Sequence, residues 1–141
     1  MQKFNIFVED LAAGEHVFKT AAGDTFMLAL CAAANAPVAT NSLLANLTTV
    51  SLTNLVDATP DVTISSASQT TGTFTLKITD YVLTATGAVG PFRYAVLYNS
   101  TSTSKTNPLI GWFDYGSDIT LANTDTFTLN FDETNGVFTI V

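Results

Sequence analysis

Residues 126–141 read TFTLNFDETNGVFTIV, and the alternation of apolar and polar side chains predicts two β-strands joined by a turn. Phe127, Leu129 and Phe131 have one parity, and the residues between them are threonine and asparagine. Successive side chains of a strand point to opposite sides of a sheet, so one side of this strand is buried and the other is wetted. The segment therefore predicts antiparallel, half-buried β-structure.

The turn is predicted at Asn135-Gly136, because a type I′ turn needs positive φ at both central residues. A two-residue turn would place Phe131 opposite Ile140, whereas a four-residue loop from Glu133 to Gly136 would place Leu129 opposite Ile140. Both registers keep the apolar side chains together, so we expect a terminal hairpin in either case.

The strand pattern extends back to about Phe92, so the residues from there to the end of the chain are predicted to form a C-terminal β-meander. Residues 92–98 are apolar at nearly every position, which predicts a central strand covered on both sides. Residues 73–83 change parity between Ile78 and Tyr81, so we expect a bulge or bend near Asp80. The full set of expected strands is Phe4–Val8, Glu15–Lys19, Thr25–Ala32, Thr48–Leu52, Val62–Ser65, Thr73–Leu83, Phe92–Tyr98, Leu109–Asp114, Asp118–Leu121, Thr126–Phe131 and Val137–Val141.

Little helix is expected. Pro37 and Thr40-Asn41-Ser42 interrupt the alanine-rich stretch from Cys31 to Leu47, which leaves a single helical turn at Ser42–Asn46. Ser65–Gly72 and Asn99–Asn107 have the composition of exposed loops. The sequence thus predicts one all-β domain over residues 1–141, an antiparallel β-sandwich or barrel-like fold, with residues 1–20 as a possible N-terminal arm.

The composition excludes several classes of partner. Charged residues make up only 12% of the chain, about half the usual share, and the formal net charge is −7 with five scattered cations. Nucleic acids and anionic membranes both require clustered lysine and arginine, so neither is expected as a partner. We see no targeting segment, and the single Cys31 excludes an intrachain disulfide, as expected for a chain folded in a reducing cytosol.

No group with the spacing of a catalytic, cofactor or metal site is evident. His16 is the only histidine, and no Gly-x-Ser-x-Gly motif accompanies it. Asp114 and Asp118 flank Gly116, and Asp57 and Asp61 form a second spaced pair, but carboxylates at strand ends usually cap turns. We therefore predict no enzyme activity, no cofactor and no metal.

Two sets of side chains invite an interaction hypothesis. Arg93 lies within the apolar strand at 92–98 and must be paired or reach solvent, and we expect an ion pair with Asp114 or Asp80 that fixes the strand register. The N-terminal run of bulky side chains is either a first strand or an arm that packs on a neighbouring subunit, and its predicted partner-binding residues are Phe4, Ile6, Phe7 and Val8.

The aromatic residues of the C-terminal half admit two interpretations. They could form a flat platform for a sugar ring, or they could pair across strands within the core. The second interpretation is favoured for the set Tyr94, Tyr98, Trp112, Phe113 and Tyr115.

Three segments of this half resemble small virion structural proteins of tailed bacteriophages. They are FRYAVLYN at 92–99, PLIGWFDYGS at 108–117 and TFTLNF at 126–131, and the segment from Phe18 to Leu30 is similar to the opening of the same group. The resemblance covers about half of the chain and consists of strand patterns, while residues 32–71 fit it poorly.

The resemblance implies a β-rich, non-enzymatic protein present in many copies on a virion. Among such roles we expect a capsid decoration (cement) protein on the outer surface of the head, made in the host bacterial cytoplasm. Its partners would be the major capsid protein and copies of itself, with a trimer favoured. The alternatives are a tail or head–tail connector component, or a carbohydrate- or receptor-binding sandwich that uses the loops at 65–72 and 99–107.

Overall fold

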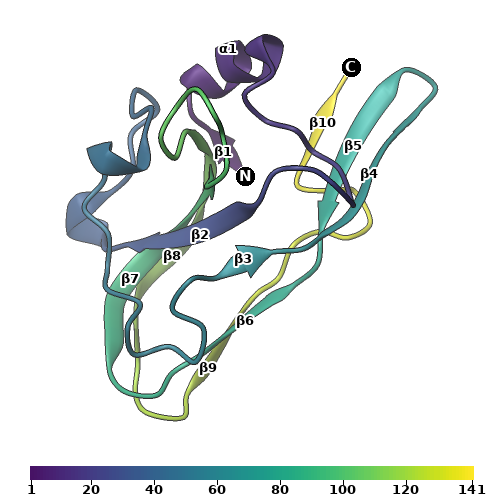
Figure 1. Ribbon diagram of the computed structural model, residues 1–141. Helices are drawn as coiled ribbons and strands as arrows, with labels where there is room; N and C mark the ends of the chain where they lie inside the picture. The colour runs from purple at the N-terminus through teal and green to yellow at the C-terminus, as the bar shows by residue number, and fades with distance from the viewer.

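The computed structural model describes residues 1–141 and is all-β with antiparallel sheets, as predicted (Figure 1). The strands are β1 (Gln2–Lys3), β2 (Phe26–Cys31), β3 (Asp61–Val62), β4 (Ile64–Thr70), β5 (Thr73–Ile78), β6 (Tyr81–Thr84), β7 (Val89–Asn99), β8 (Leu109–Leu121), β9 (Thr126–Leu129) and β10 (Phe138–Ile140). One α-helix, α1 (Ile6–Ala13), and two 3-10 turns, η1 (Ala33–Asn35) and η2 (Leu44–Asn46), complete the fold.

The larger sheet has five strands in the order β1-β8-β7-β2-β3. β7 lies at its centre and is apolar on both sides, as its sequence predicts: Leu97 belongs to the core between the layers, and Val96 belongs to the core on the opposite side. β8 is one continuous strand where the sequence suggested two. Gly116, at φ 96°, absorbs the local bend, and the Asp114 carboxylate accepts a 2.7 Å bond from its N–H.

The second layer consists of the sheet β10-β5-β4 and the pair β6-β9. The prediction of an exposed loop at 65–72 is wrong, because β4 and β5 form a hairpin across this segment. The turn residues Thr71 and Gly72 have φ of 50° and 88°, and Thr70 pairs with Thr73. Positive φ at both positions of a two-residue loop is the type I′ geometry, so that turn occurs here.

The predicted C-terminal hairpin is wrong. β9 pairs with β6, so that Leu129 lies opposite Tyr81, and β10 pairs with β5, so that Ile140 lies opposite Phe74. Residues 132–136 form a protruding turn between the two strands. The Asp132 carboxylate accepts bonds of 2.9 and 2.8 Å from the N–H groups of Thr134 and Asn135, which closes this turn internally.

The change of parity near Asp80 has the predicted effect, since the strand is interrupted between Ile78 and Tyr81. The Asp80 carboxylate accepts a 2.7 Å hydrogen bond from Phe131 N–H at this point. β9 and β10 therefore follow the two halves of the bent β5–β6 segment, and Figure 1 shows β10 beside the β4–β5 hairpin.

The predicted strand at Phe4–Val8 is also wrong, because residues 6–13 are helical. Phe7 and Leu11, four residues apart in α1, turn toward the main core, and Gly14 at φ 78° ends the helix with bonds to Asp10 and Leu11. β1 pairs with β8, and Phe7 and Phe18 pack in the main core.

Two further strand predictions fail, and one helical turn is confirmed. Residues 15–19 and 48–52 form no strand, and Val50 N–H instead donates a single 2.8 Å bond to Leu30. The turn η2 lies within the predicted segment 42–46, where the Asn46 side chain accepts bonds from Ser42 and Leu43.

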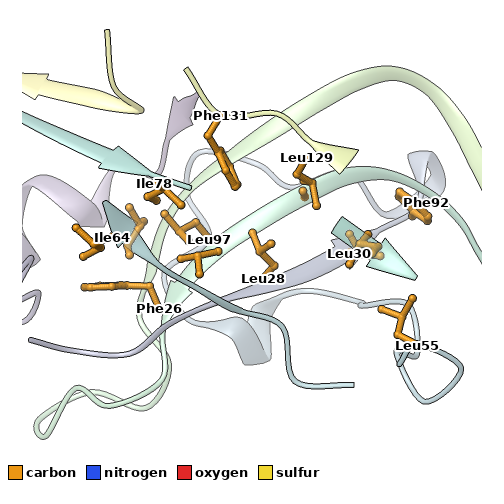
Figure 2. Packing of buried hydrophobic residues seen from close by; sticks show 14 of the residues in the cluster. Phe26, Leu28, Leu30, Leu55, Ile64, Ile78, Phe92, Leu97, Leu129 and Phe131 are labelled. Atoms are coloured by element: carbon orange, nitrogen blue, oxygen red, sulfur yellow. The ribbon is translucent and has the colours of Figure 1, made fainter. Parts of the chain in front are cut away.

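The main core lies between the two layers. Figure 2 shows Leu28, Leu97 and Phe92 of the large sheet pointing toward Ile78 and Leu129 of the second layer. A smaller cluster on the opposite side of the large sheet includes Phe4, Cys31 and Trp112. The large sheet is thus covered on both sides, and at one margin the two-residue strand β1 covers only part of the edge of β8.

Candidate functional site: an aromatic groove between β8 and β9

A groove of about 260 Å³ opens between the two layers, where β8 and β9 approach each other. β8 is hydrogen-bonded to β7 and β1, and β9 is hydrogen-bonded only to β6, so no ladder joins β8 to β9. The lining residues come from β7, β8, and β9 with the segment that follows it: Phe92, Arg93, Ala95, Phe113, Asp114, Tyr115, Phe127, Thr128, Leu129, Asn130 and Phe131.

Aromatic side chains span this groove. The ring centroids of Phe113 and Phe131 are 5.3 Å apart, and those of Tyr115 and Phe127 are also 5.3 Å apart, both in edge-to-face arrangements. Phe92 lies on the floor of the groove, and its ring centroid is 5.6 Å from that of Phe127. Tyr115 remains 60% exposed at the rim, so the groove presents an apolar, partly open surface to solvent.

The predicted ion pair is present at the edge of the groove. Arg93 donates from Nε to Asp114 Oδ1 at 2.7 Å and from Nη2 to Oδ2 at 2.9 Å, a bidentate arrangement. The hydrogen bond to Arg93 is the main cause that lowers the pKa of Asp114, and the same bond raises the pKa of Arg93. Of the two predicted partners Asp114 is therefore the one used, and Asp80 is engaged with Phe131.

The five aromatic residues considered as a sugar platform do not share one surface. Trp112 and Tyr98 are buried in the smaller core, where the ring centroids of Trp112 and Phe4 are 4.6 Å apart. Phe113 faces the main core instead, because neighbouring residues of β8 point to opposite sides. The loop at 99–107 contains no aromatic residue beyond its boundary with Tyr98.

The four residues predicted to bind a partner are divided by the structure. Phe4 is fully buried and Phe7 almost so, each within its own chain. Ile6 is half-buried, and Val8 is 54% exposed on α1. Phe4 precedes α1 and packs in the smaller core, whereas the helix turns Phe7 toward the main core and Val8 to the outside.

A polar cluster beside α1 was missed by the sequence analysis. Asn99 is fully buried at the end of β7, and its amide donates to Asp24 Oδ2 at 2.7 Å and to the Glu15 carbonyl at 2.8 Å. Asp10, also fully buried, pairs with Lys105 from the loop after β7. Asp10 and Asn99 lie far apart in the chain, so local patterns offered no signal for this cluster.

His16 lies inside this cluster, with its Nδ1 3.3 Å from Asn99 Nδ2. Its ring packs between Phe7 and Phe18, and its Nε2 is buried without a hydrogen-bond partner. Burial is the main cause that lowers the pKa of His16, while the nearby carboxylates of Asp10, Asp24 and Glu15 oppose that shift. The hydroxyls of Ser102 and Ser104 bond to Glu15, so neither serine forms a triad with His16.

The remaining candidate residues have structural contacts. Asp57 accepts a 2.6 Å bond from the Tyr81 hydroxyl, which lowers the pKa of Asp57. Cys31 is buried, and burial raises the pKa of its thiol to about 11. The structure brings no three His, Cys, Asp or Glu side chains together in a way that could hold a metal ion. None of its helices combines the length and apolar character that crossing a bilayer requires.

Comparison with known proteins gave no match to any family model, curated protein or solved structure.

Proposed function

We propose that this chain is a structural protein of a tailed-phage virion, and specifically a capsid decoration (cement) protein. The observation that supports this most is where the phage-like segments lie. Residues 92–99, 108–117 and 126–131 contribute β7, most of β8 and β9, which are the strands that line the aromatic groove. The part of the chain that resembles virion proteins is therefore also the part with an uncovered apolar surface.

The character of the surface agrees with an assembly role. Two of the five cations, Arg93 and Lys105, are used in ion pairs within the chain. Several exposed apolar side chains remain on the outside, among them Val8, Val56 and Val82. Such apolar side chains suit contact with another protein better than contact with a polyanion.

The proposed mechanism is thermodynamic linkage. The protein would bind on the outer surface of the head, where subunits of the major capsid protein meet, as a symmetric oligomer for which a trimer is favoured. A protein that binds only the mature shell stabilises that state by RT ln(1 + [L]/Kd), which is about 2.7 kcal/mol per site at a free concentration 100 times Kd. Many sites on one shell would multiply this effect.

The test is a comparison of purified virions with and without this protein, imaged and then exposed to heat and osmotic shock. We expect the protein on the outside of the head, and we expect heads without it to release DNA at lower temperature. Density confined to the tail or to the connector would favour those locations instead. Heads that lack the protein and are equally resistant would contradict a cement role.

A further inference from the structure

The two layers form an incomplete barrel. Hydrogen-bonded neighbours run from β1 through β8, β7 and β2 to β3, and the chain continues from β3 directly into β4. β4 pairs with β5, the bent segment leads into β6, and β6 pairs with β9. Every step is connected except the last one, between β9 and β8. The aromatic groove lies in this gap, which we call the seam.

Both sides of the seam have unpaired main chain. β1 covers β8 only at Gly111 and Trp112, so the same edge of β8 has no strand partner from Phe113 to Leu121. Across the seam, β9 pairs along one edge only. Unpaired strand edges can bind extended polypeptide, because an added strand presents the matching row of alternating N–H and C=O groups.

The side chains in the seam define what such a strand would contain. The floor and walls include Phe92, Phe113 and Phe127, which favour apolar side chains at every second position of the incoming strand. Arg93 and Asp114 neutralise each other at the rim, so the seam itself offers no net charge. The whole chain has a formal charge of −7, which favours a segment that is neutral or basic.

β1 shows that this edge of β8 already accepts an added strand. Gln2 and Lys3 pair antiparallel with Trp112 and Gly111, and Phe4 N–H continues the contact with a 3.2 Å bond to Ile110. The open part of the β8 edge starts at Phe113, the residue after Trp112. A segment in the seam would therefore extend an interaction that the chain itself begins.

We propose that the seam binds an extended segment of another protein, apolar at alternate positions and without net negative charge, which completes the barrel by pairing with β8 and β9. This inference deepens the proposed function and rests on it for the identity of the donor, a segment of the major capsid protein. The two unpaired edges and the apolar lining between them support the binding mode independently of that identity.

A second copy of this chain is a poorer occupant. Its strands with alternating apolar side chains are already paired within its own sheets, so a copy would have to unfold a strand in order to donate it.

The test uses purified full-length protein and a library of random peptides of about ten residues, enough to follow the open edge of β8. Peptides are selected on the wild type alone and are then tested on Tyr115→Asp, a variant with a carboxylate at the exposed rim of the seam. We expect enriched peptides with alternating apolar residues and no internal proline. Tyr115→Asp should weaken their binding about tenfold or more. Val56→Asp is the matched control, because Val56 is 70% exposed and lies outside the groove lining.

Hydrogen exchange identifies where the selected peptides bind. We expect slower exchange at the amides of 113–121 and 126–130 when a peptide is bound, because a ladder protects the main chain on both edges. Failure to enrich any peptide, or protection confined to other segments, would overturn the proposal. A concentration-dependent dimer with the same protected amides would also overturn it, since the occupant would then be a second copy.

The same measurement on heads that lack the protein separates the two proposals. Binding to heads with protection of 113–121 and 126–130 supports both. Binding without that protection removes the seam proposal and leaves the decoration role intact. If the protein does not bind heads but selected peptides still protect the seam, the decoration role fails and the strand-binding site stands.

Discussion

Arg93 and Asp114 form a bidentate ion pair across β7 and β8, next to a break in the register of these two strands. The ladder shifts between Phe92 and Tyr94, and Tyr94 lies opposite Asp114. The guanidinium also lies over the Tyr94 ring, 5.3 Å from its centroid. The pair thus fixes the strands at the point where their main-chain ladder is irregular and where the groove begins.

Replacing Arg93 should therefore weaken the β7–β8 register. We expect Arg93→Met to lower the urea midpoint slightly at neutral pH, and Arg93→Lys to fall between it and the wild type, because an ammonium cannot reproduce the planar two-bond contact. The pair is largely exposed, so added salt should reduce the difference. Equal midpoints for all three proteins would show that the ion pair has no role in stability.

The pH dependence of this pair has a definite sign. Arg93 lowers the pKa of Asp114 below its usual 3.8, so the pair stabilises the fold above that value and the stabilisation is lost as the pH falls through the lowered pKa. The gap between wild type and Arg93→Met should close at strongly acidic pH. Urea denaturation at neutral pH and at about pH 3 checks this.

Gly136 is predicted to tolerate no side chain. Its φ is 84°, and an added Cβ would lie 2.5 Å from the Leu76 carbonyl oxygen and 2.6 Å from the Thr75 methyl group. Gly136→Ala should lower the free energy of unfolding by roughly 2–5 kcal/mol, the sum of left-handed strain and steric overlap. Chemical denaturation measures this change.

Gly72→Ala is the matched control for that substitution. Gly72 has nearly the same φ, 88°, but no atom lies within 4 Å of an added Cβ. Gly72→Ala should lower the free energy of unfolding only by the backbone strain, roughly 1–2 kcal/mol. Equal losses for the two variants would mean that the turn at 132–136 moves away from β5 freely.

The buried carboxylate of Asp10 should make Lys105 important for folding. Asp10 is fully buried, and one of its oxygens has no hydrogen-bond partner. Lys105→Met would leave the carboxylate without its cation and should lower the free energy of unfolding by roughly 1–3 kcal/mol. The double variant Asp10→Asn/Lys105→Met should recover part of this loss, because no buried charge then remains.

A thermal or urea double-mutant cycle tests the coupling between the two residues. Additive losses in the double variant would contradict it and would indicate that Lys105 acts only through the packing of its aliphatic stem. The same cycle reports on the loop at 100–107, which the cluster attaches to α1 through Asp10 and to residues 15–24 through Glu15.

Much of the fold follows from sequence periodicity. The apolar run at 92–98 predicts a strand covered on both sides, which corresponds to β7, and a strand was also expected at 25–32, where β2 lies. The bend at Asp80 was predicted from a change of parity, and the structure adds that the Asp80 side chain replaces a ladder bond there. These features depend on residues close together in the chain.

The wrong predictions concern segments whose structure is set by contacts with residues far away in the chain. Asn135-Gly136 has the composition of a hairpin turn, but Asp132 closes that turn within itself, and β5 and β6 provide the pairing partners. The strand predicted at 4–8 lacks strict alternation, and Gly14 was an available signal for a helix end. The Arg93–Asp114 pair could be predicted because a cation inside an apolar strand needs either a partner or solvent, whereas the seam exists only through the strand order.

The last prediction concerns His16, the only histidine of the chain. Burial lowers its pKa below the usual 6.5 even though Asp10, Asp24 and Glu15 face it along with Lys105 and the Asn99 amide. The unfolded chain therefore binds more protons than the folded chain just below pH 6.5, and stability should fall as the pH decreases through this range. His16→Phe retains a ring among Phe7, Phe18 and Phe26 and cannot titrate. Its stability should therefore not fall with decreasing pH in this range.

Urea denaturation between about pH 8 and about pH 5, above the range in which most carboxylates titrate, measures both slopes. The absolute stability of His16→Phe is not the readout, because the variant also loses the contact with Asn99. A wild type that becomes more stable toward pH 5 would show that the three carboxylates outweigh burial and hold the imidazolium. Equal slopes in the two proteins would show that His16 does not titrate in this range.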